Sequence, residues 1–337
     1  MERNRFYPKS FIPVLVIFLV LFVLGIIASF MFGARSLTLQ EVIDGLMKHQ
    51  GEIYETSVVQ KRVVRTIFAL CCGAALGIAG VLMQSVTRNP IADPSILGVN
   101  NGAALFVVCG MAFFQINTAS QYIWFALAGA VLTAIFVFGI GSLGRGGATP
   151  LKLVLAGAAT SAAFSSLVTA VMIPRSYVMD QFRFWQVGSV GAGTWDSLVL
   201  LLPFLLTGVL IAVITAPALN ALALGEEMAT GLGVKTSLLR LVAAFAGVIL
   251  CGATTAVAGP IGFVGLLATH VIRMLLGPDL RYLIPMSALS GAVILTVSDV
   301  LGRLIGRPGE LEVGVLTAFL GAPLLIILTM KAKVRSL

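Results

Sequence analysis

Few side chains in this sequence could carry out covalent or metal chemistry. The two histidines, His49 and His270, lie far apart in the chain. The four cysteines all lie inside apolar runs without a Cys-x-x-Cys spacing: Cys71, Cys72, Cys109 and Cys251. This pattern predicts small buried side chains and argues against a metal site or a disulfide framework. A membrane-embedded enzyme would need a convergent set of catalytic groups, and we expect none here.

Two short strings mimic nucleotide-binding motifs. Gly139, Gly141 and Gly144 have the G-x-G-x-x-G spacing, but they end an apolar run instead of linking a strand to a helix. Lys235-Thr236 resembles the end of a phosphate-binding loop, but Val234 stands where that motif requires glycine. We therefore expect no nucleotide site and no cofactor in this chain.

The side chains best suited to recognition are arginines beside two apolar runs. Arg62 and Arg65 are three residues apart, so they share one face of a helix, and Arg303 ends the ninth run. A planar guanidinium can pair with a carboxylate through two parallel hydrogen bonds. Arg303 has two interpretations: it pairs with Asp299 one helical turn earlier, or it binds an acidic partner.

The elements that carry these residues are predicted to be membrane-spanning helices. Hydrophobic residues make up 58% of the 337 residues and charged residues only 11%, whereas charged residues form about a quarter of a soluble domain. A span needs about 20 apolar residues, so one all-α bundle, a single domain over residues 1–337, can contain about ten spans. We expect them at about 11–33, 63–83, 96–114, 122–142, 151–172, 197–217, 238–258, 261–276, 285–304 and 313–331.

Charge and composition predict how this bundle lies in the membrane. Basic residues precede the first run, which is too long for the core of a signal peptide, so we expect a retained span whose amino terminus is cytoplasmic. An even number of spans then places both termini inside. The polar stretch 34–60 has apolar residues at helical spacing and is expected on the outer surface. The basic residues are scattered, which argues against a nucleic-acid partner.

Several strings, in this order along the chain, together resemble the iron-chelate and cobalamin permease family. They are KRVVRTIFALCCGAALGIAGVLMQSVTRNPIADPSILGVNNGA (61–103), FWQVGS (184–189), LGEEMATGLGV (224–234), GPIGFVGL (259–266) and FLGAP (319–323). Members of that family are the membrane subunits of type II ABC importers. The resemblance implies ten spans, a second permease subunit that is identical or paralogous, two ATPase subunits that hold ATP and Mg, and an extracytoplasmic substrate-binding protein, in a bacterial cell membrane.

The resemblance also implies roles for particular residues. The 224–234 segment would be the cytoplasmic coupling helix that docks on the ATPase, although an ordinary capped surface loop is the plainer interpretation. Its expected coupling residues are Leu224, Gly225, Glu226, Glu227, Ala229, Leu232, Gly233 and Val234. Arg62, Arg65 and Arg303 match positions at which family members bind acidic residues of the binding protein.

The translocation pathway is expected to be a wide wall of small and weakly polar side chains. The residues predicted for this pathway and its gate are Met83, Gln84, Ser85, Asn89, Pro90 and Ser161. Asn89-Pro90 is either a gate hinge or a rigid turn between two spans. The cargo is expected to be a ferric siderophore, with haem or cobalamin as the alternative.

A competing class of function is the ion-coupled secondary transporter. That mechanism typically needs ionisable residues at the middle of the membrane. The candidates here, Asp196, Asp299 and Arg273, all lie near the ends of spans. The sequence therefore favours a transporter that is driven by a partner ATPase.

Overall fold

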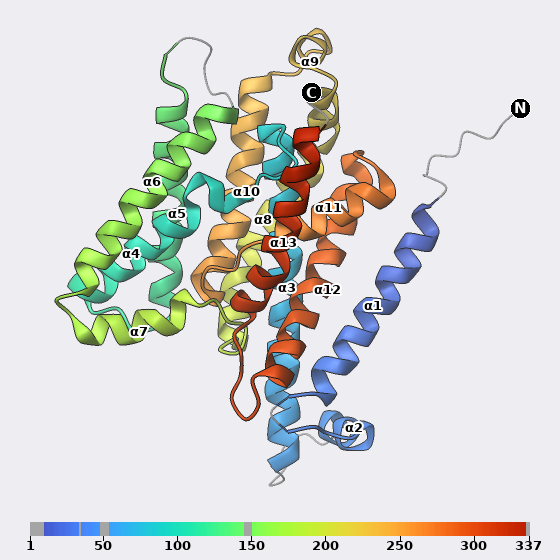
Figure 1. Ribbon diagram of the computed structural model, residues 1–337. Coiled ribbons are helices and arrows are strands. Elements are labelled where there is room, and N and C mark those ends of the chain that lie inside the picture. Colours follow the sequence, from blue (N-terminus) through green and yellow to red (C-terminus); the bar gives the residue numbers. More distant parts are fainter. Residues whose placement is uncertain (1–9, 34, 48–53, 145–149, 335–337) are drawn as a thin grey trace, which may run out of the picture.

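Helices account for all of the regular secondary structure in the part of the chain that the structure describes. This computed structural model describes residues 10–33, 35–47, 54–144 and 150–334. Thirteen α-helices lie in these ranges (Figure 1): α1 Phe11–Met31, α2 Leu39–Met47, α3 Tyr54–Thr87, α4 Val99–Phe114, α5 Ala119–Gly141, α6 Pro150–Met172, α7 Ser176–Gln186, α8 Trp195–Ala223, α9 Glu226–Gly231, α10 Thr236–Ala258, α11 Val264–Leu276, α12 Leu280–Ile305 and α13 Val313–Val334. A short 3-10 turn, η1, covers Pro94–Leu97.

Ten of these helices are apolar enough to be membrane spans. Seven are long enough to cross a bilayer by themselves: α1, α3, α5, α6, α8, α10 and α12. The apolar parts of α4, α11 and α13 are shorter, so their crossing the membrane remains a prediction. The chain is therefore a multi-pass membrane protein with an all-α fold, and the count and bounds of its spans stay a prediction.

Two segments differ from the sequence-based prediction. The second span was expected to begin near residue 63, but α3 begins at Tyr54 and continues without a break to Thr87. The extra turns are polar, so a hydropathy pattern does not mark them as part of a span. Likewise α7 forms from a segment that reads as polar punctuation, because Val178 and Phe182, one turn apart, bury one face of it.

The centre of the bundle is α3, whose glycines let other helices approach its backbone. Gly73 lies against the backbone of Gly291 on α12, and Gly80 lies against Gly265 on α11. A methyl group at either α3 glycine would meet backbone atoms of the neighbouring helix, which cannot move aside. Small residues therefore provide close helix packing, which matters in lipid because little hydrophobic force draws the helices together.

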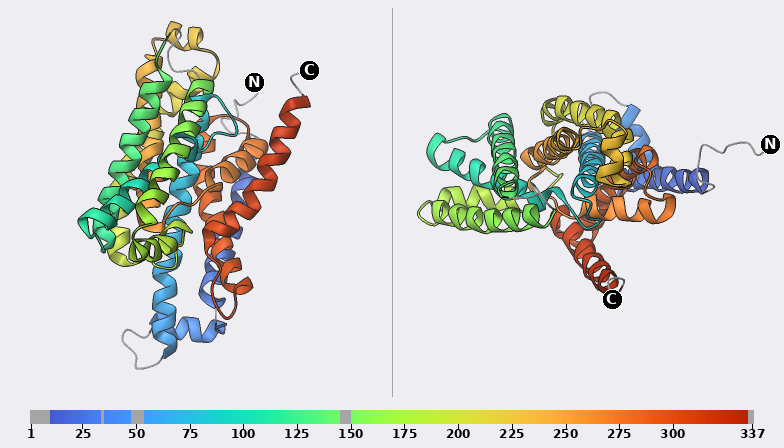
Figure 2. Two further views of the ribbon diagram at one scale, coloured as in Figure 1. Left: turned by 60° about the vertical axis from the view of Figure 1, so that its left-hand side comes forward. Right: turned by 90° about the horizontal axis from the view of Figure 1, so that it is seen from above.

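The bundle has two distinct ends. The 224–234 segment that carries α9 lies at one end, toward which the start of α1 and the end of α13 also point (Figure 1). The helices α2 and α7 and the loop between α12 and α13 lie toward the opposite end. Seen from above, α1 and α13 lie at the periphery of the bundle (Figure 2). We call the first end the α9 end and the second the α2 end.

Candidate functional site

At the α2 end, Arg62 is a buried side chain that ties α3 to the end of α1. It is 7% exposed, and its Nη1 donates hydrogen bonds to the carbonyl oxygens of Phe30 at 2.7 Å and Met31 at 3.1 Å. Its Nη2 donates to the carbonyl of Arg35. A Cβ at Gly33 would collide with this guanidinium, so glycine makes room for it. Arg62 therefore satisfies carbonyls that the end of α1 leaves unpaired.

Arg65 and Arg303 share one buried carboxylate, Asp299. The Nη2 of Arg65 lies 2.7 Å from Oδ1 of Asp299, and the Nη2 of Arg303 lies 3.0 Å from Oδ2. Arg303 also donates to the carbonyl and the hydroxyl oxygen of Ser29, at 3.0 and 2.8 Å. Asp299 therefore pairs with two guanidinium groups and links α3 to α12.

These contacts bear on the predicted docking residues. The pair between Arg303 and Asp299 is present, and Arg303 is only 2% exposed. Arg62 is likewise buried and bonded to carbonyls, whereas the side chain of Arg65 is 13% exposed and forms a second ion pair with Glu310. Docking of an acidic partner therefore remains a prediction, and Arg65 is the member of the three that lies nearest to solvent.

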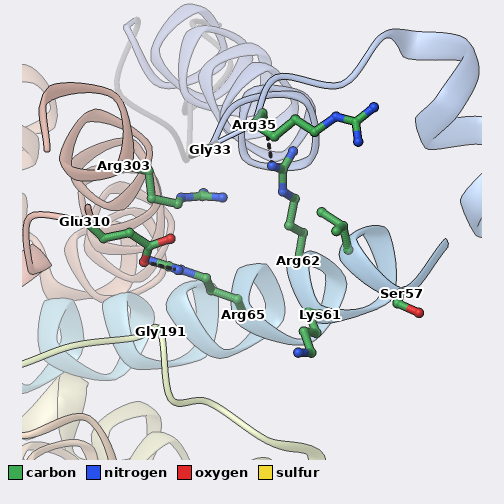
Figure 3. Close-up of a pocket in the computed structure, with 10 residues that line it drawn as sticks. Gly33, Arg35, Ser57, Lys61, Arg62, Arg65, Gly191, Arg303 and Glu310 are labelled. Atoms are coloured by element: carbon green, nitrogen blue, oxygen red, sulfur yellow. Dashed lines mark hydrogen bonds and ion pairs between the residues drawn. The ribbon is translucent and has the colours of Figure 1, made fainter. Parts of the chain in front are cut away.

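The arginines surround an open cavity of about 580 Å³ at this end (Figure 3). Five of its lining residues are cationic, Arg35, Lys61, Arg62, Arg65 and Arg303, and Glu310 is the carboxylate among them. The sequence-based site did not include Arg35 or Lys61. The run Lys61-Arg62 contained a signal for Lys61, whereas Arg35 reaches the cavity through tertiary folding.

At the α9 end, a short helix projects beyond α8 and α10 between two glycines. Gly225 has φ 128° and Gly233 has φ 82°, conformations that residues with a side chain rarely adopt. Glu226 and Glu227 occupy the first turn of α9, where acidic groups favour the positive end of the helix dipole. A short helix therefore lies inside the 224–234 segment, and its role as a coupling helix stays a prediction.

The side chains around α9 divide into a fixed side and an exposed side. Ala229 is buried, while Leu224, Met228 and Leu232 are 70%, 60% and 65% exposed. The sequence-based set omitted Met228, although a large apolar residue in a polar loop was a usable signal. This end of the molecule therefore presents apolar surface outside the long apolar helices.

Two polar contacts tie the α9 segment to the bundle. The Nη2 of Arg240 on α10 lies 2.9 Å from Oε2 of Glu226, and this cation lowers the pKa of the Glu226 carboxyl. Arg88, just after α3, donates to the carbonyl of Leu222 at 2.6 Å, near the end of α8. The α9 helix is therefore connected directly to α10, and α3 is connected to the end of α8 that leads into α9.

The predicted pathway residues lie in and after the last turns of α3, with Ser161 apart from them on α6. Met83 is buried beside Gly247 of α10, and the buried side-chain amide of Gln84 has no hydrogen-bond partner in the described part of the chain. Ser85 donates back to the carbonyl of Val81 at 2.7 Å. Ser161 lies near Gly98, at the start of α4.

The turn after α3 is closed locally. The Asn89 side-chain oxygen accepts a hydrogen bond from the amide of Ile91 at 3.2 Å, and the Asn89 carbonyl accepts one from Ala92 at 3.1 Å. Pro90 lies inside this turn and donates no backbone hydrogen bond. Such a turn is compatible with both the hinge and the rigid-corner interpretations.

The helices α1 and α6 are buried to the same small extent, but their exposed faces differ in composition. In both α1 and α6, 17% of the most apolar window is buried. The helix α1 exposes large apolar side chains such as Ile12, Val16 and Val20. In contrast, α6 exposes, beside the larger Leu155 and Leu167, a set of small and weakly polar residues: Ala162, Ala163, Ser165, Ser166, Thr169 and Ala170. The first face suits lipid chains, and the second suits a protein partner or an aqueous pathway.

Comparisons with known proteins agree with this architecture. The chain is 37% identical over 313 residues to the "probable siderophore transport system permease protein YfiZ" of Bacillus subtilis, covering 93% of this chain and 94% of the relative. It is 40% identical over 311 residues to the ferric enterobactin transport system permease protein FepD of Escherichia coli, covering 92% of each.

A solved structure shares the fold over nearly the whole chain. It is described as "an inward-facing conformation of a putative metal-chelate type ABC transporter", and it matches with a TM-score of 0.81 at 29% identity, covering 95% of this chain and 99% of the other. The model of the FecCD transport family matches residues 20–331. The chain therefore belongs to the FecCD transport family, whose iron-chelate permeases it resembled from its sequence motifs.

Proposed function

We propose that this chain is the permease subunit of an ABC importer that carries a ferric siderophore into a bacterial cell. The observation that carries the proposal is full-length similarity, at 37% and 40% identity, to permeases named for siderophore and ferric enterobactin transport. The complex would contain a second permease subunit, two ATPase subunits and an extracytoplasmic binding protein. ATP and Mg would be bound by the ATPases. Both termini and α9 would face the cytoplasm.

The α9 segment would receive the force that ATP generates. Leu224, Met228 and Leu232 offer exposed apolar side chains that fit a groove on an ATPase subunit. Movement of α9 would reach α10 through the Glu226–Arg240 pair and α3 through the Arg88–Leu222 hydrogen bond. Since α3 leads into the Asn89-Pro90 turn, this route connects the ATPases to the proposed gate.

The translocation pathway would run along the small-residue face of α6. Ser165, Ser166 and Thr169 are exposed there, and their hydroxyls are compatible with water. Ser166 and Thr169 already donate to carbonyls of their own helix, at 3.0 Å each. They would therefore bind a bulky chelate only weakly, which suits passage more than storage. Affinity for the cargo would reside in the binding protein.

The α2 end would receive the binding protein. The cavity there has five cationic lining residues, which would attract acidic side chains and orient the partner as it approaches. Arg65 and Lys61 would make the direct contacts, because Arg62 and Arg303 are buried. The two buried arginines would fix the shape of the docking surface.

Uptake into vesicles tests the function. The permease, its ATPase and its binding protein would be reconstituted in proteoliposomes with ATP inside, and uptake of ferric enterobactin, ferric citrate, haem and cobalamin would be measured. We expect uptake of a ferric chelate that requires both the binding protein and ATP hydrolysis. If only haem or cobalamin is taken up, that compound and not a ferric siderophore is the cargo. Uptake that follows an ion gradient without ATP would contradict the proposal and favour a secondary transporter.

A further inference from the structure

Glu310 occupies the edge of Arg65 that faces the cavity at the α2 end. The other edge, formed by Nε and Nη2, is bound to Asp299, with Nη2 2.7 Å from Oδ1. The remaining nitrogen, Nη1, lies 2.6 Å from Oε2 of Glu310 (Figure 3). Arg65 is thus held from the inside by one carboxylate and covered from the outside by another.

The two carboxylates differ in how easily they can leave. The Asp299 side chain is 3% exposed and is also bound by Arg303, so its loss would leave Arg303 without a carboxylate partner and Arg65 with Glu310 alone. The Glu310 side chain is 40% exposed and lies on the loop between α12 and α13. An exposed ion pair of this kind contributes little net stability, because water can replace the partner. Glu310 is therefore the exchangeable carboxylate.

The charges around the cavity favour an incoming anion once Glu310 has moved. Among the lining residues, Glu310 stands as one carboxylate against five cations. Without it, the Nη1 edge of Arg65 would point into a cationic cavity while Asp299 kept the guanidinium in place. That arrangement is an oriented receptor for another carboxylate.

We propose that Glu310 is a built-in substitute for a carboxylate of the substrate-binding protein. In the free permease Glu310 pairs with Nη1 of Arg65, and on docking an acidic side chain of the binding protein takes its place. One charge-assisted hydrogen bond is broken and one of the same kind is made, while the contact with Asp299 persists. The inference rests on the proposed function, since it needs a binding protein at this end.

The exchange would also couple docking of the binding protein to the position of the loop before α13. Glu310 lies three residues before Val313, the first residue of α13. The same loop is fixed to α12 by a hydrogen bond from the amide of Leu311 to the carbonyl of Gly302, at 3.1 Å. Release of Glu310 would therefore remove the contact between this loop and α3 at the moment of docking, while the Leu311 hydrogen bond keeps the loop on α12.

The test compares two charge-neutralising variants on this loop. Glu310→Gln removes the substitute carboxylate. Glu312→Gln removes the same charge two residues further on, and Glu312 forms no ion pair in the described part of the chain. Binding of the protein that supports uptake would be measured on permease in nanodiscs, with association and dissociation rates at low and high salt.

We expect Glu310→Gln to tighten binding by about 2- to 5-fold, mainly through slower dissociation, with the effect retained at high salt. Glu312→Gln should change only the association rate, and only at low salt. A fluorophore on Gly309→Cys gives a second readout. Its signal should change on docking in the wild-type background and should already be changed before docking in the Glu310→Gln background.

The outcomes distinguish a failure of the Glu310 exchange from a failure of the proposed importer function. If the two variants bind alike, or if Glu310→Gln weakens binding while the wild type binds well, the exchange is wrong and the importer assignment stands. If the wild-type permease binds no such protein in any vesicle that takes up ferric chelate, the proposed function itself fails and the exchange fails with it.

Discussion

The two ends of the bundle are stabilised by opposite kinds of contact. At the α2 end, Arg62, Arg303 and Asp299 are buried and paired with one another or with backbone carbonyls. At the α9 end, large apolar side chains such as Met228 are exposed, and the Glu226–Arg240 pair is one of few polar ties. One end therefore keeps a fixed conformation with a cationic surface, whereas the other exposes an apolar surface that is suited to contact with a partner protein.

Removing the shared carboxylate should break the α2 end most severely. Asp299→Asn keeps the shape of the side chain but leaves the buried Arg303 without a counter-charge and Arg65 with Glu310 alone, and we expect a loss of about 3–5 kcal/mol in stability. Thermal and denaturant unfolding in nanodiscs would measure it. The control is Asp196→Asn, because Asp196 is exposed at the start of α8 and forms no ion pair among the described residues. Equal losses in both variants would mean that Asp299 is not the centre of this end.

A charge placed on the exposed apolar surface should disable the α9 end. Met228→Glu puts a carboxylate where we expect an apolar groove of the ATPase, so the affinity for the ATPase subunit should fall by about 30-fold. The control is Thr230→Glu, which adds the same charge two residues further along. Two residues correspond to about half a helical turn, so this charge lies on the opposite side of α9. Co-purification and titration of the ATPase against permease in nanodiscs would measure both. If the control weakens binding as much as Met228→Glu, the apolar surface is not the contact.

Salt should weaken partner binding at the two ends to different extents. Raising the salt concentration to about 0.5 M should weaken attachment of the binding protein at the α2 end by about tenfold, because screening acts on its exposed charges. Attachment of the ATPase at the α9 end should change by about twofold or less, since apolar burial is not screened. Titrations of each partner at several salt concentrations would show this contrast. A salt dependence of the same size at both ends would remove the distinction.

The smallest effect is expected at Asp279, which caps α12 near the α9 end. Hydrogen bonds from the Arg281 side chain, together with one from Asn220, lower the pKa of Asp279 from 3.8 to about 2. A carboxyl whose folded-state pKa is depressed stabilises the fold above its unfolded pKa and loses that contribution as the pH falls through the folded value. The stability difference between wild type and Asp279→Asn should therefore be constant from pH 8 to about 5 and shrink between about 3.8 and 2. Unfolding measured across this pH range would test it, and a difference that shrinks already near neutral pH would contradict the assignment.

Much of the fold could be predicted from the sequence, because membrane helices are marked by apolar length. The run at 261–276 was expected to be short and appears as α11, Val264–Leu276, and the run at 313–331 appears as α13. The start of α3 at Tyr54 could not be predicted in this way. Its first turns are polar, and they are held in part by the packing of Val59 with Val42 on α2.

The sequence selected candidate site residues, but it did not show which of their side chains are buried. The arginine spacing placed Arg62 and Arg65 on one face of a helix and did not place Arg303 near them. Their burial depends on carbonyls of residues 30, 31 and 35 and on Asp299, which tertiary packing alone brings near. The pair of glycines at 225 and 233 identified α9, because their backbone conformations follow from local chemistry. Which side chains of α9 face outward depends on its packing against the bundle, and so Met228 was missed.

The side of the membrane on which α9 lies tests the central claim most directly. Met228→Cys would be reacted with a membrane-impermeant maleimide in intact spheroplasts and in inside-out vesicles, with the wild-type chain as the background for its four native cysteines. We predict labelling only in inside-out vesicles, and protection from labelling when the ATPase subunit is bound. Labelling in intact spheroplasts, or labelling that the bound ATPase does not change, would contradict the proposal that force enters this permease through α9.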